Sequence, residues 1–369
     1  MSLIKVKSRG TDNVTGGGRR NLLINGAFNI AQRGTSSTTA NFTTVDRWRL
    51  NWGGGGTLTQ AQHTLSSSDT PYTLGLRKSY HATVTSASNA GGTWSQFEQH
   101  IEAQNIAQSG WNYTSSSSKL TFSFWVKSSL AGTFYTQYRT VDGTVYYYNK
   151  SFTLVANTWK KITHTIPGNS NLTINDDNGH GFTVIVAPDY GTTYTGHAQA
   201  VADAWYVRTQ NSGYFPNFAQ DWSNTANATF EITATQLEVG DSATDFEHRS
   251  FDMEMEDCER YFQTYSDQLW QGTNEHATNY SLYLDGKFRK KMRATPTATI
   301  VGTVNIGRPQ VGVTQRPNAI GGLSKEGFYN CSWPSSGTYG GSLGTHGDAY
   351  YRMVVGAGPT NRIDFSAEF

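Results

Sequence analysis

The stretch SKLTFSFWVKSS, at residues 118–129, decides the fold class of this chain of 369 residues. Its apolar side chains recur at every second position and fall on one face of an extended strand, as Leu120, Phe122, Phe124 and Val126 do. The positions between them form the opposite face, which carries Thr121, Ser123, Trp125 and Lys127. This alternation is typical of an antiparallel strand with one face against a core.

The same pattern recurs on both sides of this stretch. Residues 132–154 read as a hairpin that turns at Asp142-Gly143, and 158–167 alternates Ile162 and Ile166 with polar positions. Further strands are expected at 181–188 and 228–240, where the alternation changes phase near Gln236. Short strands separated by Gly, Asn and Pro predict an all-β fold, with an antiparallel jelly-roll β-sandwich at residues 21–245.

The composition indicates packed strands with no strong charge preference. A chain of this length is expected to form two globular parts. Charged residues make up 15%, aromatic residues make up 13%, and the net charge is +1. We therefore expect no nucleic-acid partner. No stretch is apolar enough for membrane insertion or a secretion signal, so synthesis in a cytoplasm is expected.

Residues 1–20 are predicted to form a basic N-terminal arm. Its basic side chains oppose a single acid, Asp12, and they are Lys5, Lys7, Arg9, Arg19 and Arg20. The glycines at 16–18 favour flexibility. This pattern fits a tail without a special role, or an anchor that docks on a larger acidic assembly.

A helix is predicted at residues 246–266, which begin with the sequence FEHRSFDMEMEDCERYFQTY. Ser250 is a suitable N-cap, and Asp252 and Glu254 fall in the first turn, where the helix dipole favours acids. Spacings of four, three, four and three create one apolar seam, formed by Phe251, Met255, Cys258, Phe262 and Tyr265. Such a short seam fits packing on the chain's own sandwich or an oligomer stem between two β domains.

Residues 267–369 are predicted to form a smaller C-terminal β domain. Strand patterns return within 279–292, 297–304, 349–357 and 361–369, with a turn expected at Asp285-Gly286. A Gly/Ser-rich loop at 330–348 carries Trp333 and Tyr339. The two cysteines, Cys258 and Cys331, match no metal or redox spacing and are interpreted as free thiols or one bridge.

Few motifs indicate catalysis, so a non-enzymatic protein without a cofactor is predicted. The sequence contains no P-loop, H-E-x-x-H motif or dinucleotide-binding glycine pattern. Because glycosidase carboxylates can come from distant segments, that class stays open. The best metal candidate is the segment 175–181, where Asp176 and Asp177 could bind Ca²⁺, although a plain Asx-rich turn is favoured.

Aromatic residues outside the predicted apolar rows give the stronger signal. Flat rings beside amide and hydroxyl groups suit sugars, because the sugar C–H groups stack on the ring while polar groups bind the hydroxyls. The candidate glycan-binding residues are Trp125, Tyr146, Tyr148, Trp205, Tyr214, Trp222, Trp333 and Tyr339. The competing interpretation places most of them in the core or in a subunit interface.

Two segments resemble a family of tailed-phage virion proteins common in marine phages. The first is GRRNLLINGAFNIAQRGTS at 18–36, followed by TVDRWRL at 44–50, and the second is TQLEVGDSATDFEHRSFDMEMEDCERYFQ at 235–263. The segments 119–135 and 159–168 resemble jelly-roll carbohydrate-binding modules found in that context. Members are tail fibre, receptor-binding or virion structural proteins, and the last 100 residues match only loosely.

The resemblance implies a virion protein whose helix is a stem between an attachment-proximal sandwich and a distal tip. The expected protein is a homotrimeric tail fibre or similar appendage that docks on other virion proteins and binds host surface polysaccharide. One alternative is a capsid-attached fibre or decoration protein that stabilises the shell. Another is a tail-spike polysaccharide depolymerase, which the lack of internal repeats disfavours.

Overall fold

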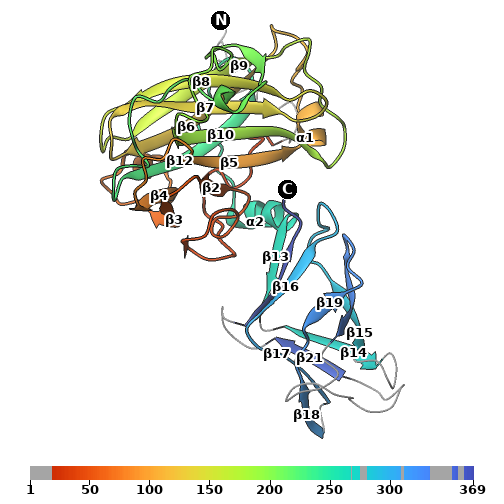
Figure 1. Ribbon diagram of the computed structural model, residues 1–369. Helices are drawn as coiled ribbons and strands as arrows, with labels where there is room; N and C mark the ends of the chain where they lie inside the picture. The colour runs from red at the N-terminus through yellow and green to blue at the C-terminus, as the bar shows by residue number, and fades with distance from the viewer. Residues whose placement is uncertain (1–18, 267, 275–280, 309–310, 333–350, 356–360) are drawn as a thin grey trace, which may run out of the picture.

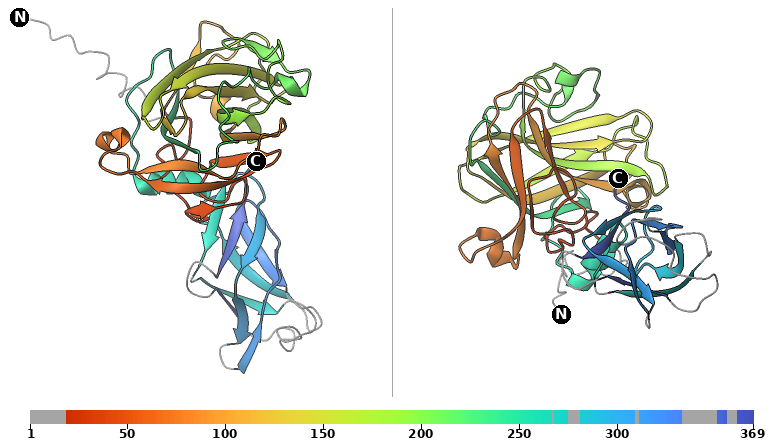
Figure 2. Two further views of the ribbon diagram at one scale, coloured as in Figure 1. Left: turned by 60° about the vertical axis from the view of Figure 1, so that its left-hand side comes forward. Right: turned by 60° about the horizontal axis from the view of Figure 1, so that its bottom comes forward.

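The computed structural model describes residues 19–266, 268–274, 281–308, 311–332, 351–355 and 361–369. Figure 1 shows a large β-sandwich, a helix beside it and a smaller β unit that extends away from the sandwich. Figure 2 shows the same two units from two further sides. Among the described residues, no helix has the length and hydrophobicity needed to span a membrane.

Two antiparallel six-stranded sheets form the sandwich. The first sheet has the order β1 (Ser36–Ser37), β3 (Thr57–Thr64), β4 (Lys78–Ser86), β12 (Thr229–Val239), β6 (Lys119–Ser128) and β9 (Lys160–Pro167). The second has the order β11 (Trp205–Val207), β8 (Tyr146–Leu154), β7 (Gly132–Thr140), β10 (His180–Tyr190), β5 (Trp94–Glu102) and β2 (Arg49–Gly53). The predicted all-β fold with antiparallel sheets is confirmed.

Strand β6 shows why the two sheets pack together. Its apolar row, Leu120 to Val126 at every second position, is fully buried in the core, as the alternation predicts. Phe124 lies opposite Ile162 of β9, and the rings of Phe124 and Phe152 meet edge to face at 5.6 Å between the sheets. Trp125, on the other face, stays partly exposed.

The phase change predicted near Gln236 corresponds to an irregularity in β12. The pairing of β12 with β6 shifts between Thr233 and Gln236, and Ala234 adopts a left-handed conformation with φ of 51°. The extra residue bends the strand and frees backbone groups for another partner. Thr235 N donates to the carbonyl of Gly26 at 3.0 Å, so the N-terminal segment of the sandwich attaches at this point.

The hairpin prediction at Asp142-Gly143 is confirmed. Strands β7 and β8 pair from Gly132 opposite Leu154 to Thr140 opposite Tyr146, and Gly143 has φ of 63° in the turn. The second Asp-Gly pair behaves differently. Asp285 and Gly286 lie inside strand β15, where Gly286 pairs with Phe328, so the turn predicted there is wrong. Without a side chain on Gly286, the ring of Phe328 can lie against the strand backbone.

The predicted helix is real but much shorter than 246–266. Helix α2 covers Phe251–Glu259, and its N-cap Ser250 accepts a hydrogen bond from Met253 N, as predicted. The chain then becomes extended, and β13 (Phe262–Tyr265) pairs with β22 (Arg362–Ser366). The predicted seam therefore does not exist as one helical stripe, since Phe262 and Tyr265 lie in a strand.

The seam residues are also occupied within the chain. Cys258 is fully buried with Tyr261 against Ile24 and Ile30 of the sandwich, and Met255 packs on this cluster. Phe262 and Tyr265 are buried as well, whereas Phe251 is 56% exposed. The interpretation that the helix packs on its own sandwich fits these contacts, and the residues predicted for an oligomer seam do not form one. Cys258 and Cys331 are both buried and are not joined by a disulfide.

The end of the predicted basic arm is part of the folded chain. Arg19 donates to Asp257 of α2 at 3.0 Å and to the carbonyl of Leu23 at 2.8 Å, and Arg20 pairs with Glu238 at 3.5 Å. Arg19 therefore joins this segment to α2, Arg20 joins it to β12, and neither is available to a separate arm. The other predicted arm residues, Lys5, Lys7 and Arg9, lie outside the described residues.

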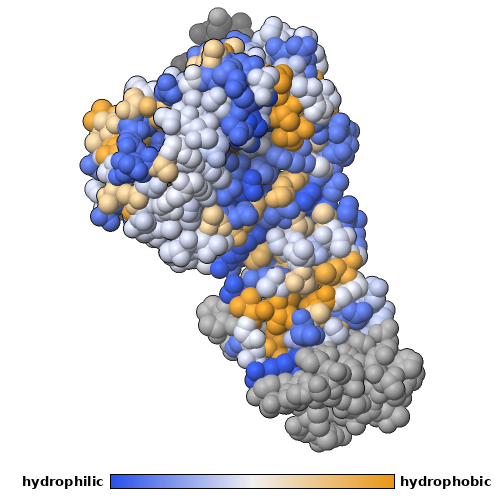
Figure 3. All heavy atoms as spheres, viewed as in Figure 1, coloured by the Kyte–Doolittle hydropathy of each residue, from blue (hydrophilic) through white to orange (hydrophobic). Residues whose placement is uncertain are grey.

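The C-terminal unit contains two antiparallel sheets with their own core. The smaller sheet has the order β13, β22 and β16 (Thr297–Val301). The larger has the order β18 (Val311–Gln315), β17 (Val304–Arg308), β21 (Tyr351–Val355), β14 (Leu269–Asn274), β15 (Ser281–Lys287), β20 (Gly327–Ser332) and β19 (Ala319–Gly321). In this core Phe328 stacks on Phe365, and Phe288 meets Phe365 edge to face. Figure 3 shows apolar side chains gathered on the surface of this unit below the junction.

The last residues of the chain lie between the two units. The Phe369 ring packs against His100 and His180 of the sandwich at 5.9 and 5.3 Å. Glu368 pairs with Arg33 at 3.2 Å and with the buried Arg47. The junction is therefore built from side chains of both units and not from a flexible linker alone.

Candidate functional site

The outer face of the second sheet carries a groove lined by aromatic and polar side chains. This aromatic groove encloses about 220 Å³ and is lined by Trp94, Gln96, Arg139, Tyr190, Tyr194 and Tyr214. The inner face of the same strands builds the core, so strand alternation sends every second side chain outwards into the groove. Trp94 and Gln96 come from β5, Arg139 from β7 and Tyr190 from β10.

The long connection between β10 and β12 supplies the remaining wall. It runs across the outer face of the sheet and contains β11 and a short 3-10 turn, η3 (Asn211–Gly213). Phe215 is fully buried with Tyr135, Ile185 and Tyr190, and it anchors this connection on the sheet. Tyr194 and Tyr214 are thereby held, partly exposed, beside the groove, with their rings edge to face at 5.9 Å.

Polar side chains lie among these rings. Gln137 Nε2 donates to Asn149 Oδ1 at 2.9 Å and to the carbonyl of Tyr214 at 2.6 Å, and Arg139 Nε donates to Gln137 Oε1 at 2.8 Å. The guanidinium of Arg208 covers the Tyr214 ring at 3.9 Å. These contacts fix the rings in place, because the polar side chains on this face hydrogen-bond one another and the backbone of Tyr214.

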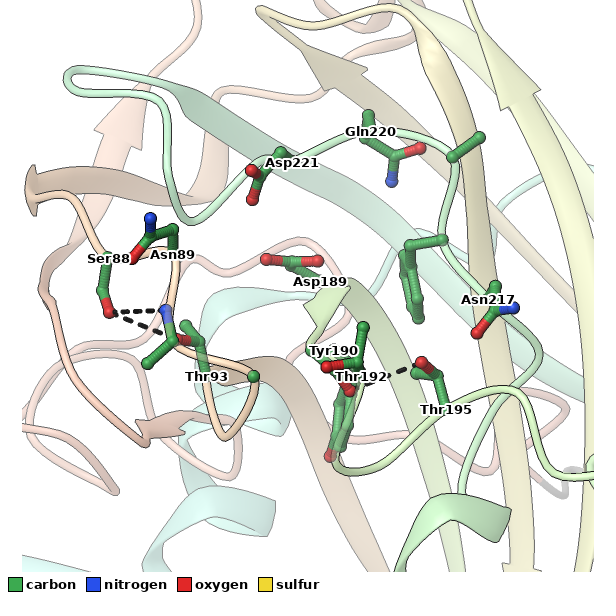
Figure 4. Close-up of a pocket in the computed structure, with 15 residues that line it drawn as sticks. Ser88, Asn89, Thr93, Asp189, Tyr190, Thr192, Thr195, Asn217, Gln220 and Asp221 are labelled. Atoms are coloured by element: carbon green, nitrogen blue, oxygen red, sulfur yellow. Dashed lines mark hydrogen bonds between the residues drawn. The ribbon is translucent and has the colours of Figure 1, made fainter.

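A second cavity opens at the end of the sandwich. This end pocket encloses about 500 Å³ and is lined mainly by polar loop residues, including Asn89, Asp189, Asn217, Gln220 and Asp221. Figure 4 shows the carboxylates of Asp189 and Asp221 around the same hollow as the Asn89 amide. Burial, reinforced by the charge of Asp221, raises the pKa of Asp189 to about 6. Its Oδ2 accepts a hydrogen bond from Ser223 N at 3.1 Å.

Tyr190 lines both cavities, so the aromatic groove and the end pocket adjoin each other. Its ring packs on Phe215 at 4.6 Å, and its hydroxyl donates to Gln96. Together the two cavities place flat rings next to carboxylates and amides. That combination can bind a polyhydroxylated molecule through ring stacking and several hydrogen bonds.

The predicted glycan-binding residues fall in several different places. Tyr214 lines the aromatic groove. Tyr146 and Trp205 pack partly exposed against the main core, and Trp205 Nε1 donates to the carbonyl of Pro167 at 2.7 Å. Trp125 lies on the outer face of the other sheet, near Trp159. Trp333 and Tyr339 lie outside the described residues.

Two of the predicted residues are core residues and cannot stack on a ligand. Trp222 is fully buried, with its Nε1 donating to the carbonyl of Thr229 at 3.2 Å. Tyr148 is 4% exposed and packs between the sheets against Tyr138. In the run Tyr146 to Tyr148, it is the middle residue that faces outwards. Tyr147 stacks on Tyr206 at 5.7 Å and meets Tyr214 edge to face at 6.1 Å.

Most groove residues were not predicted from the sequence. Trp94 and Gln96 alternate with the buried Ser95 and Phe97 along β5, and this alternation is the signal that could have identified them. Tyr190 and Tyr194 gave no such signal, because their position depends on how the β10–β12 connection folds over the sheet.

The suggested calcium ligands show the structure of a plain turn. Asp177 Oδ1 accepts the backbone N–H of Gly179 at 2.8 Å, and Asp176 Oδ1 accepts Nε2 of Gln108 at 2.7 Å. The contact of Asp177 is that of an Asx turn, and the contact of Asp176 is a hydrogen bond between two side chains.

No protein-family model and no curated protein matches this chain. Similar solved structures include one described as "CBM4 structure and function", with 12% identity, 58% of this chain and 98% of that chain covered, and a TM-score of 0.29. A "Family 16 Carbohydrate Binding Module-2" has 10% identity, 50% and 89% coverage and a TM-score of 0.24.

An arabinose-bound α-L-arabinofuranosidase has 13% identity and a TM-score of 0.30, over 62% of this chain and 28% of that chain. The similar structures thus include carbohydrate-binding modules, and nothing in the comparisons identifies a phage or tail-fibre family. With TM-scores below 0.5, these likenesses carry no inference about function, which has to come from the residues of the site.

Proposed function

We propose that this chain is a non-enzymatic binding protein that holds a glycan in the aromatic groove and the adjoining end pocket. The observation that carries the proposal is the groove itself, in which Trp94, Tyr194 and Tyr214 border a cavity that also contains Gln96 and Arg139. Partly exposed rings fixed by packing are suited to stack on sugar C–H faces, because little side-chain entropy is lost on binding.

The end pocket would bind the next part of the same glycan. Asp221, Asn217 and Gln220 offer carboxylate and amide groups that can accept from and donate to hydroxyls. A polar pocket next to an aromatic groove supports an oligosaccharide ligand of more than one ring over a single small sugar.

Hydrolysis is the alternative that one observation favours. Asp189 and Asp221 share the end pocket, and a carboxyl with a pKa near 6 beside a second acid is the kind of pair used for general acid catalysis. We favour binding because Asp189 is buried and its Oδ2 is engaged by Ser223 N. Release of reducing sugar that is lost in Asp189→Asn would support the depolymerase instead.

The proposal for the biological role follows from the resemblance of the sequence to tailed-phage virion proteins. We propose a virion appendage of a tailed phage, with a jelly-roll sandwich, supported by the alternation of β4, β5, β6 and β7 between the two sheets. Several copies, three in our proposal, would raise the avidity of weak glycan binding. Since the helix seam is occupied within the chain, association would use other surfaces. The apolar surface of the C-terminal unit in Figure 3 is available for it.

A particle-level experiment separates this role from that of a capsid decoration protein. An antibody to the C-terminal unit would be applied to intact virions and located by electron microscopy. Label at the tail supports the appendage, and label spread over the head supports the decoration protein.

The binding proposal is tested with an array of bacterial surface polysaccharides, followed by calorimetric titration of the best oligosaccharide. The variants are Trp94→Ala and Tyr194→Ala, and each is expected to weaken binding by about 1–3 kcal/mol, the range for a lost stacking contact. Trp125→Ala is the matched control, since Trp125 is a partly exposed tryptophan on the outer face of the opposite sheet. Equal binding by all three variants and the parent would place the site elsewhere.

A further inference from the structure

Two histidines and a glutamate converge on the outer face of the first sheet, away from the groove. They are His63 on β3, His81 on β4 and Glu231 on β12. Each offers one ligand atom, and these atoms lie within 4.8 Å of one another. Among the described residues, no other group of three or more His, Cys, Asp and Glu side chains brings its ligand atoms this close together.

Strand register explains why these side chains meet. Glu231 lies directly opposite His81 across the β12–β4 pair. His81 in turn lies opposite Ala61 of β3, so His63, two residues further along β3, is its diagonal neighbour on the same face. Opposite and diagonal residues of adjacent strands are within reach of one another. Three hydrogen-bonded strands thus hold the three ligands, and the backbone ladder fixes their spacing.

From this geometry we propose a Zn²⁺ site formed by His63, His81 and Glu231, with a water in the fourth position. Two imidazoles and one carboxylate form a ligand set that zinc accepts in tetrahedral geometry. His63 Nδ1 lies 2.8 Å from Oε1 and His81 Nδ1 lies 3.6 Å from Oε2 of Glu231, so both histidines present Nδ1 to the same carboxylate. The proposal does not rest on the glycan-binding function.

The surroundings prepare two of the ligands for a metal. His81 Nε2 lies 3.0 Å from Thr83 Oγ1, and donation to that hydroxyl would leave the lone pair on Nδ1, which is buried and has no hydrogen-bond partner. Glu231 is 2% exposed, and the hydroxyl of Ser79 donates to its Oε1. Its carboxylate is thereby oriented as a metal ligand needs to be.

His63 and Lys127 give the site the freedom to close on an ion. The His63 side chain is 50% exposed, so it can move the short distance that brings Nδ1 to about 2.0–2.1 Å from zinc. Lys127 Nζ lies 3.2 Å from Glu231 Oε2, and its charge would oppose that of the metal. It also pairs with Asp69 Oδ1 at 3.1 Å and lies over the Trp159 ring, so it keeps partners when zinc takes the glutamate oxygen.

The experiment is calorimetric titration of the full chain, purified without an affinity tag, with Zn²⁺. The parent is expected to bind one ion per chain. His63→Ala is expected to bind at least about tenfold more weakly, because even an outer partner of a zinc ligand costs 10–100-fold in affinity. His63 is half exposed, so its removal leaves the core intact, which circular dichroism would check. His197→Ala, which removes a partly exposed histidine far along the chain, is the matched control.

Lys127→Met tests the site through an expected increase in zinc affinity. Removing the competing cation is expected to tighten zinc binding severalfold while His197→Ala leaves it unchanged. Absence of saturable binding by the parent, or equal binding by His63→Ala and the parent, would overturn the site. Bound zinc is also expected to raise the melting temperature of the parent more than that of His63→Ala, since an ion that binds the folded state stabilises it.

Discussion

Arg260 and Glu102 form a bidentate ion pair, in which the Nε–Oε1 and Nη2–Oε2 distances are both 2.7 Å. Arg260 caps the end of α2, and Glu102 is the last residue of β5, so the pair joins the start of the C-terminal unit to the sandwich. Tyr261 also donates its hydroxyl to Glu102. Burial disfavours the charged carboxylate, but the hydrogen bonds from Arg260 and Tyr261 outweigh it and keep the pKa of Glu102 below its usual range.

Glu102→Gln is expected to loosen this junction strongly. The Glu102 side chain is fully buried, and neutralising it leaves the guanidinium of Arg260 without its carboxylate. Because the Arg260 side chain is partly exposed and can be hydrated, the expected cost is about 1.5–3 kcal/mol, the range for a hydrogen bond to a charged group. We expect faster proteolytic cleavage between residues 246 and 266 and a lower melting temperature.

The matched control for the junction is Lys290→Ala. Lys290 pairs with Glu256 at 3.0 Å, but both side chains are well exposed, so the loss is expected to be below about 1 kcal/mol. Equal cleavage rates in Glu102→Gln and the parent would show that other contacts hold the two units together.

The sequence predicted the strands better than it predicted the junction and the site. The alternation of apolar and polar residues in β6 and β9 correctly predicted which side chains face the core, because each strand has one buried face. The same reasoning could not separate Tyr147 from Tyr148, since a run of three tyrosines has no alternation. Trp222 lies in an irregular segment, where neither the helical nor the strand periodicity of side chains applies. Only tertiary packing places it in the core.

The length of the helix was overestimated for a similar reason. The spacing from Phe251 to Tyr265 fits a helical seam, but Phe262 and Tyr265 fit an alternating strand equally well. Pairing of β13 with β22, about 100 positions away in the chain, decides between the two. Long-range pairing of this kind leaves no local signal.

Trp222→Ala is expected to unfold the sandwich more readily and not to weaken ligand binding specifically. Trp222 is fully buried against Phe230, and removing a buried aromatic side chain costs about 3–5 kcal/mol. Chemical denaturation measures the loss. Trp205→Ala, which removes a partly exposed tryptophan, is expected to cost less. A Trp222→Ala protein with parental stability would contradict the core assignment.

Gly26→Ala is expected to detach the N-terminal segment from the irregularity in β12. A methyl group on Gly26 would lie 2.2 Å from the carbonyl oxygen of Thr235, which is backbone and cannot move aside. Such overpacking costs about 1–3 kcal/mol. Gly92→Ala is the control, because its added methyl group meets no atom within 4 Å and the change is expected to stay within about 0.5 kcal/mol. The comparison uses the free energy of unfolding of both variants and the parent.

His164 is expected to make the sandwich less stable in acid. It points between the sheets, with Nδ1 2.8 Å from Thr136 Oγ1, and burial together with the charge of Lys150 lowers its pKa to about 4. In the unfolded chain the pKa returns to about 6.5. Between these values the unfolded state takes up a proton that the folded state refuses. The contribution to stability is therefore complete above pH 6.5 and is lost as the pH falls towards 4.

The expected loss from His164 is about 2 kcal/mol between pH 6.5 and pH 5. Asp46 and Asp189 have raised pKa values, each about 6, and work in the opposite direction, so the parent alone does not isolate the histidine. His164→Gln keeps a polar group at the site without an ionisable one. Urea denaturation of both proteins across this range is expected to show the smaller pH dependence in the variant. Parallel curves for the two proteins would mean that His164 does not titrate as its burial requires.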